Sequence, residues 1–255
     1  MKDRRRLCLV IAALGIALLV QPPASWAQAS AANAASNPIP RTSDGKPDFT
    51  GFFNLQYTPN MALGKEDAVP YTPAGKAAYI NHDAKDDPTS NCWFPGVPRI
   101  MQSPYPAQFI QTPAYLEILF EYMHMFRSIP LNGRPHPTNM EPAFMGDSTG
   151  HWEGDTIVVD TTNLKGPPWT WLDTAGHQHS DELHVTERFR RTAETIEYEY
   201  TVDDPKMYAK PWTLSRVFTP LKLNPALPEL IEYSCTENNL DIQHLVSSKP
   251  ALGKK

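Results

Sequence analysis

The sequence contains few cysteines and no apolar run long enough to cross a membrane. Only three of its 255 residues are cysteine, and Cys8 lies inside an N-terminal apolar run. That run, from Leu7 to Val20, has 14 residues, whereas a membrane-spanning helix needs roughly 20. The motifs G-x-S-x-G and H-E-x-x-H, the phosphate-binding loop and the dinucleotide-binding fingerprint are also absent. These absences argue against the hydrolases, zinc proteases and nucleotide-dependent enzymes that carry such motifs.

The N-terminus has the order of segments found in a secretory signal peptide. Basic residues at positions 2–6 precede the apolar run, two prolines follow it, and residues 25–29 offer small side chains for cleavage. We therefore expect a signal peptide at residues 1–29 and a periplasmic or secreted mature protein without a stable membrane anchor. An uncleaved anchor is the alternative.

The charge balance is acidic. The net charge is −5, and residues 1–29 hold four of the 23 basic residues and one of the 28 acidic ones, so their removal would leave −8. An acidic chain is poorly suited to nucleic acids or anionic membranes, because both repel it. The expected partner is a small-molecule ligand or substrate, and the sequence does not define the oligomeric state.

Two cysteines, Cys92 and Cys235, would remain in the mature protein. In an oxidising compartment such a pair often forms a disulfide, and we expect one here. Two free buried thiols are the alternative.

Proline is abundant. Its 26 residues are roughly twice the average usage, which predicts long ordered loops. Residues 30–48 are small, polar and proline-rich, and predict a flexible leader. Residues 49–246 are expected to form a single domain, followed by a disordered tail at 247–255. The sequence shows no internal repeat.

The domain is predicted to be mainly β. Short β-branched or alternating runs bounded by turn residues predict strands at 52–57, 107–112, 115–129, 155–162, 182–191, 195–202, 212–220 and 229–235. Residues 72–85 are the best helix candidate, because Thr72 can cap a helix that starts at Pro73. Sequential strands with short turns favour an antiparallel meander. We expect a lipocalin-like closed or half-open barrel with long proline-rich loops and few short helices.

Two polar side chains interrupt apolar strand faces. Glu187 shares a face with Val185 and Phe189, and His124 shares one with aromatic residues of the run 115–129. An unpaired buried carboxylate is costly, so Glu187 either pairs with an arginine or serves a ligand. His124 is either a hydrogen-bonded core residue or an acid–base group at the wall of a cavity.

The stretch 170–191 has the highest density of titratable side chains. A turn at Gly176 would bring Asp173 to His177, an arrangement that fixes the tautomer of a proton-transferring histidine. Trp171 could stack on a flat ligand. His177 and His179 are two positions apart and could together bind a metal, with Glu182 or His184 as a further ligand, but this spacing alone is weak evidence. A solvated loop with a local Asp–His hydrogen bond is the structural alternative.

A second group of candidates follows in the loop 126–137. Arg127, Arg134 and His136 surround an Asn-Gly turn, and paired guanidinium donors can hold a carboxylate or a phenolate. The same side chains could instead pair with Glu141 and Asp147.

Several phrases resemble a group of secreted bacterial proteins. The phrases cover most of the mature chain and are NCWFPGVPRIM (91–101), FEYMHMFRSIPLNGRPHP (120–137), MGDSTGHWEGDTIVVDTT (145–162), WLDTAGHQHSDELHVTERFRR (171–191) and TVDDPKMYAKPWT (201–213). The resemblance implies a periplasmic β-rich domain and supplies no reaction or catalytic residues. The segment HWEGDTIVVD is also similar to segments that begin strands in lipocalin-like barrels.

These observations lead to a functional hypothesis. We expect cofactor-free acid–base chemistry, of a lyase, dehydratase, isomerase or hydrolase type, on a small, partly apolar molecule that is aromatic or polycyclic. His177, oriented by Asp173, would move the proton, with His179 or His124 as the opposing acid. The expected binding residues are Arg127, Arg134, His136, Trp171 and Glu187, with no metal and no cofactor. The alternatives are a non-catalytic binding protein, a metal-dependent barrel enzyme that uses His177 and His179, and a structural envelope protein.

Overall fold

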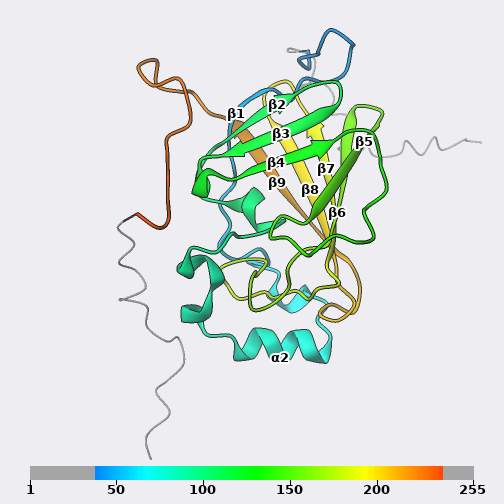
Figure 1. Ribbon diagram of the computed structural model, residues 1–255, viewed down its shortest axis with the longest axis vertical. Helices are drawn as coiled ribbons and strands as arrows, with labels where there is room; N and C mark the ends of the chain where they lie inside the picture. Colours follow the sequence, from blue (N-terminus) through cyan, green and yellow to red (C-terminus); the bar gives the residue numbers. More distant parts are fainter. Residues whose placement is uncertain (1–37, 238–255) are drawn as a thin grey trace, which may run out of the picture. The chain divides into compact units, whose positions relative to one another are not determined.

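A computed structural model of the chain describes residues 38–237 (Figure 1). The expected signal peptide, residues 30–37 of the leader and the tail at 247–255 lie outside these residues. Within the described part, no helix is both long and apolar enough to cross a bilayer.

The described residues form one nine-stranded sheet in which every neighbouring pair is antiparallel. The strands are β1 (Gly51–Asn54), β2 (Ala107–Gln111), β3 (Tyr115–Phe120), β4 (Phe126–Pro130), β5 (Asp147–Glu153), β6 (Thr156–Thr162), β7 (His184–Arg191), β8 (Ile196–Asp203) and β9 (Trp212–Pro220). Their order in the sheet is β4-β3-β2-β1-β9-β8-β7-β6-β5. The predicted mainly β fold is confirmed, whereas the strand predicted at 229–235 is wrong, because these residues form no ladder.

The sheet is not closed into a barrel. β4 and β5 are its two edges, and no ladder joins them within residues 38–237. The edges nevertheless approach each other, since the Gly133 N–H donates to the Gly150 carbonyl over 2.9 Å. A side chain at Gly150 would lie only 3.0 Å from Leu131 and 3.2 Å from Ile129, so glycine permits this approach.

Helical structure is minor, as predicted. The α-helix α2 (Pro73–Asn81) begins after Thr72, whose hydroxyl accepts a hydrogen bond from the Gly75 N–H over 3.0 Å. The 3₁₀ turns are η1 (Glu66–Ala68), η2 (Ala84–Asp86), η3 (Pro88–Asn91), η4 (Arg99–Gln102) and η5 (Tyr122–His124).

The run 115–129 is a hairpin and not a single strand. β3 and β4 pair antiparallel, with Leu119 opposite Phe126, and η5 makes the turn between them. Met123 and His124 have φ values of 56° and 52°, a left-handed conformation that ends an extended strand. The predicted aromatic face around His124 is therefore wrong, because the chain reverses before reaching it.

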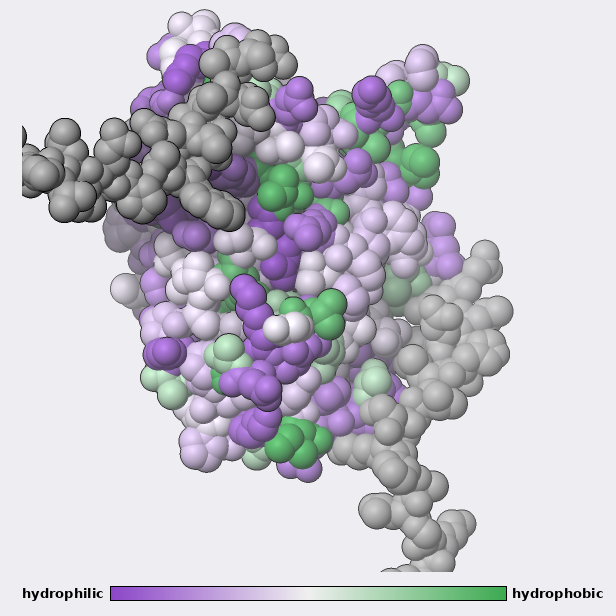
Figure 2. Space-filling view, turned by 180° about the vertical axis from the view of Figure 1, so that it is seen from behind, coloured by the Kyte–Doolittle hydropathy of each residue, from purple (hydrophilic) through white to green (hydrophobic). Residues whose placement is uncertain are grey.

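The core lies on one face of the strands. In β8 the side chains of Ile196, Tyr198, Tyr200 and Val202 are buried, while Glu199 is exposed. This is the alternation that the sequence predicts for a strand with one apolar face. The view from behind is mainly hydrophilic, with apolar residues in small separate patches (Figure 2).

The long connections gather at one end of the sheet. The strand registers show that strands β1, β3, β6 and β8 end at the same side of the sheet at which strands β2, β7 and β9 begin. Connections 55–106, 163–183 and 204–211 therefore all leave this end, where Figure 1 shows α2 and the loops below the strands. The opposite end has the short turns 112–114, 154–155 and 192–195.

The predicted disulfide is present. Cys92 and Cys235 are bonded, with their Cα atoms 5.5 Å apart, across a sequence separation of 143. The bond ties the C-terminal segment 221–237 to the connection 55–106. Next to it, the Tyr233 ring stacks on Tyr105 and Tyr122, with centroids 4.6 and 5.6 Å away.

Candidate functional site

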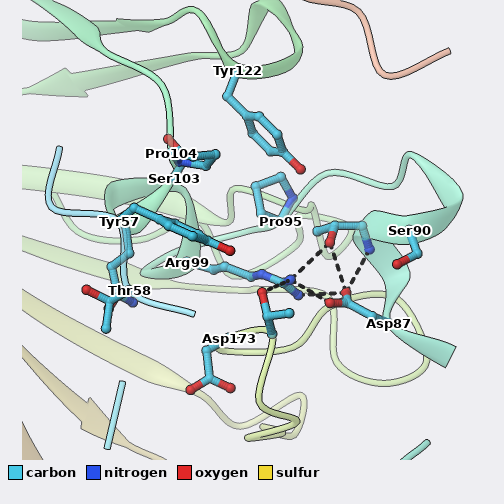
Figure 3. A pocket seen from close by; sticks show the side chains of 13 residues that line it. Tyr57, Thr58, Asp87, Ser90, Pro95, Arg99, Ser103, Pro104, Tyr122 and Asp173 are labelled. Atoms are coloured by element: carbon cyan, nitrogen blue, oxygen red, sulfur yellow. Dashed lines mark hydrogen bonds and ion pairs between the residues drawn. The ribbon is translucent and has the colours of Figure 1, made fainter. Parts of the chain in front are cut away.

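A pocket of about 230 Å³ lies at the loop-bearing end of the sheet (Figure 3). Segments far apart in the sequence build it, namely the chain after β1, the segment 87–104, η5 and the connection between β6 and β7. We call it the Arg99 pocket. Its lining residues are Tyr57, Thr58, Asp87, Thr89, Ser90, Pro95, Arg99, Gln102, Ser103, Pro104, Tyr122, Asp173 and Thr174.

Arg99 forms an ion pair with Asp87 at one wall of this pocket. Its two terminal nitrogens donate to the two carboxylate oxygens over 2.8 and 2.7 Å, a bidentate geometry. One of these nitrogens also donates to the hydroxyls of Thr89 and Thr174, over 2.9 and 3.1 Å. The guanidinium is thus held between the segment 87–104 and the loop that contains Asp173.

Asp173 and His177 form the contact that the sequence predicts. Asp173 Oδ2 lies 2.6 Å from Nδ1 of His177 and also accepts from the Met61 N–H over 2.8 Å. Oδ1 accepts from the backbone N–H of His177 over 3.0 Å. The turn passes through Gly176, where φ is +89° and an added Cβ would lie 2.4 Å from the His82 ring. Glycine is required there by both conformation and space.

His177 lies in an aromatic box and does not line the pocket. Its ring is 1% exposed and packs on Tyr79, Tyr71 and Trp212, with centroids 4.7, 6.0 and 6.0 Å away. Asp173 is the member of the pair that belongs to the pocket lining, and its carboxylate is 1% exposed and points away from Tyr57 and Tyr122 in Figure 3. The arrangement is therefore a carboxylate at the wall with an imidazole behind it.

Two buried polar groups in the pocket wall lack partners. Gln102 Nε2 and Ser103 Oγ make no hydrogen bond within residues 38–237, although the two residues are only 2% and 5% exposed. Buried polar atoms are nearly always hydrogen-bonded in folded proteins, so these two groups have unused hydrogen-bonding capacity.

His179 and Trp171 are buried near this loop but outside the pocket lining. His179 Nδ1 lies 2.8 Å from the Ser180 carbonyl oxygen, and Nε2 lies 2.6 Å from the Thr170 hydroxyl. Burial lowers the pKa of His179. Trp171 is 5% exposed and meets the His82 ring edge-on at 5.7 Å. Within residues 38–237, no three or more His, Cys, Asp and Glu side chains are grouped so that they could hold a metal.

Arg134 and His136 lie elsewhere, beside the open edge at β5. Arg134 donates to both oxygens of Asp147 over 2.9 and 2.6 Å, and His136 Nδ1 lies 2.6 Å from the same carboxylate. His136 Nε2 lies 3.3 Å from Asp160, which also contacts His184. The hydrogen bond from Arg134 is the main reason that the pKa of Asp147 is lowered. Arg134 and His136, which were expected to hold an anionic ligand, are thus paired with the protein's own carboxylates.

Arg127 and Glu187 form a buried ion pair inside the curved sheet. The Arg127 guanidinium donates to both Glu187 oxygens over 2.9 and 2.6 Å, and the Tyr198 hydroxyl donates to Glu187 over 2.8 Å. The two charged side chains are 1% and 0% exposed. This is the structural alternative considered for Glu187, and a ligand outside the core does not reach either residue.

The structure does not bring the predicted residues to one site. Of the predicted binding and catalytic residues, only Asp173 lines the Arg99 pocket, with His177 behind it. His124 is exposed and lies 3.8 Å from Glu232. The sequence reasoning missed Asp87, Arg99, Gln102 and Ser103. The signal available for the last three was VPRIMQS (97–103), a stretch in which one arginine stands between apolar residues behind a proline.

Comparison with protein-family models and with curated proteins gave no match.

Proposed function

We propose that the protein binds a small molecule in the Arg99 pocket. The observation that carries this proposal is the pair of unpartnered polar atoms, Gln102 Nε2 and Ser103 Oγ, in the wall of a concave site. Ligand sites combine such a concavity with a few convergent polar groups. The pocket also sits where long loops meet on a rigid sheet, the usual placement of binding residues.

The sheet serves this function as a half-open barrel. Its edges approach at Gly133 and Gly150, and the Arg127–Glu187 pair crosses its interior from β4 to β7. The interior is occupied by this pair and by packed aromatic rings such as Tyr198 and Phe218. A ligand therefore binds at the end of the barrel, among the loops, and not inside it.

We further propose that the protein acts outside the cytoplasm. The signal-peptide pattern at residues 1–29 supports export, and the Cys92–Cys235 disulfide fits an oxidising compartment.

A pocket-filling substitution tests the binding proposal. Ser90 lies in the pocket wall, so Ser90→Trp should block ligands that raise the melting temperature of the wild type in a small-molecule library screen. Ser215→Trp is the matched control, because Ser215 lies on the outer face of β9 in two other surface grooves. Ligands that stabilise both variants equally would show that binding takes place elsewhere.

Acid–base catalysis is the second candidate function, favoured by the Asp173–His177 contact of 2.6 Å at the pocket wall. Asp173 would exchange a proton with the ligand, and His177 would position the carboxylate and share its charge. Once a ligand is identified, Asp173→Asn should abolish its conversion while retaining binding. A ligand that wild-type protein binds but leaves chemically unchanged would rule out catalysis on that ligand and retain the binding function.

A further inference from the structure

We propose that the Arg99 pocket takes a neutral, hydroxyl-bearing ring of monosaccharide size and discriminates against anions. This inference rests on the proposed binding function and names its ligand class. Three features of the wall carry it, namely its charge balance, its unpartnered donors and its two tyrosines.

The charged side chains of the wall disfavour an anion. Arg99 is the only cationic side chain among the lining residues, and Asp87 already occupies it through two hydrogen bonds. Asp173 adds a second carboxylate to the lining. A carboxylate or phosphate ligand would therefore meet two acidic groups and one neutralised arginine, which is an unfavourable electrostatic environment.

The hydrogen bonds of the Gln102 oxygen determine which end of its amide carries the donors. Its Oε1 accepts from the Tyr200 hydroxyl and from Arg216, each over 3.0 Å, so the amide nitrogen must be the other atom. Nε2 carries two N–H groups and Ser103 Oγ carries an O–H, and none has an acceptor within residues 38–237. A ring hydroxyl or ring oxygen supplies the acceptors that these groups need.

The carboxylates complement the hydrogens of the same ligand. Asp173 Oδ1 accepts one hydrogen bond, from the His177 N–H, and Asp87 Oδ2 accepts one, from Arg99. Each oxygen has a second lone pair, which can accept a hydroxyl hydrogen. A polyol both donates and accepts at adjacent atoms, and so fits a wall in which donors and acceptors alternate.

Two tyrosines and the volume set the size of the ligand. Figure 3 shows the hydroxyl ends of Tyr57 and Tyr122 directed toward the middle of the pocket, with their rings on different sides of it. Burial raises the pKa of Tyr122 to about 12, so its hydroxyl remains a neutral donor at physiological pH. A volume of about 230 Å³ is below the roughly 300–1,000 Å³ of sites for drug-sized molecules. A single ring fits this volume better than a polycyclic molecule.

Binding to matched sugar pairs tests the inference. The probes are glucose with glucuronate, galactose with galacturonate, myo-inositol, and benzoate as an aromatic anion, measured by saturation-transfer NMR and calorimetry on the disulfide-bonded protein. At least one neutral ring should bind with a dissociation constant below roughly 10 mM. Its uronate should bind at least roughly 10-fold more weakly, because the added carboxylate faces Asp87 and Asp173.

Removal of a single hydroxyl group from the pocket gives a more specific test. Ser103→Ala should weaken binding of that neutral ring by about 2- to 10-fold. It should not lower the melting temperature of the free protein, because the Ser103 hydroxyl makes no hydrogen bond within the described residues. Ser215→Ala on the outer face of β9 should change neither quantity.

The outcomes separate this inference from the binding function. Uronate or benzoate binding as tight as that of the neutral rings overturns the ligand class and leaves the pocket as a binding site. If no neutral ring binds, the ligand class is also overturned, even when library ligands still respond to Ser90→Trp. Failure of both experiments overturns the binding function itself.

Discussion

Asp173 holds His177 from four residues away, with Oδ2 and Nδ1 only 2.6 Å apart and both side chains about 1% exposed. The same carboxylate accepts the N–H of Met61 and so connects the chain after β1 to the connection before β7. One short turn therefore orients an imidazole and also fixes the position of a pocket wall.

Loss of this carboxylate should destabilise the protein. In Asp173→Asn, the side-chain nitrogen would face the N–H donors of His177 or Met61 and leave a buried donor unpaired. We expect a loss of about 1–3 kcal/mol in the free energy of unfolding, measured by urea titration with tryptophan fluorescence. Asp181→Asn is the control, because the Asp181 side chain is 71% exposed. Equal stability of the two variants would contradict the structural role.

Breaking the Arg127–Glu187 pair should lower the free energy of unfolding more than Asp173→Asn does. Glu187→Gln leaves the Arg127 charge buried without its counter-ion, and we expect a loss of about 3–5 kcal/mol. The double variant Arg127→Met/Glu187→Leu should recover much of this loss, because it removes both buried charges. Glu153→Gln is the surface control, since the Glu153–Arg188 pair is roughly half exposed and such pairs contribute about 0–1 kcal/mol. Additive single losses in a double-mutant cycle would exclude the coupling.

The protein should become less stable in mild acid because of His179. Burial lowers its folded-state pKa below the ordinary value of 6.5, so between these two values the unfolded chain binds more protons. The contribution is fully present above pH 6.5 and is lost as pH falls below 6.5 toward the folded-state pKa, by up to about 1.4 kcal/mol per pH unit.

The variant His179→Asn removes this group and should flatten the pH dependence of the melting temperature between pH 7.5 and 5.5. His151→Asn, at a half-exposed side chain on β5, should retain the wild-type slope. Parallel curves for wild type and His179→Asn would contradict the assignment.

The disulfide should hold the C-terminal segment beside the pocket. In Cys92→Ser/Cys235→Ser the segment 221–237 loses its covalent tie across 143 residues, and the Tyr233 ring loses its constraint against Tyr122. We expect faster amide hydrogen exchange in residues 221–237, while β7 and β8 keep their protection. The free energy of unfolding should fall by about 2–5 kcal/mol. Unchanged exchange in the segment would show that packing alone retains it.

The sequence predicts the strands and contacts that depend on short-range patterns. The strands of the C-terminal half alternate with period two, and β6, β7 and β8 lie close to the predicted runs. Asp173 and His177 are four residues apart, so the turn at Gly176 suffices to join them. The hairpin at η5 was missed because residues 121–125 contain no glycine, proline or asparagine, and its left-handed positions are Met123 and His124.

The remainder depends on long-range pairing, which the sequence does not show. Glu187 finds its partner Arg127 at a distance of 60 residues, across the interior of the sheet. Gln102 and Ser103 lie in a segment without any periodicity, and only the surrounding loops make them part of a pocket. The titratable residues of the sequence therefore indicate Asp173 in the pocket lining but not its polar residues Gln102 and Ser103.

The two ends of the sheet differ, with the long connections and the Arg99 pocket at one end and short turns at the other. The turn between β7 and β8 has exposed Glu194 at its tip, at the end opposite the long connections. A linker attached through Glu194→Cys would immobilise the protein on a sensor surface with the Arg99 pocket turned toward the solution. The same separation would let the connections diversify, and new ligand preferences arise, without any change in strand pairing.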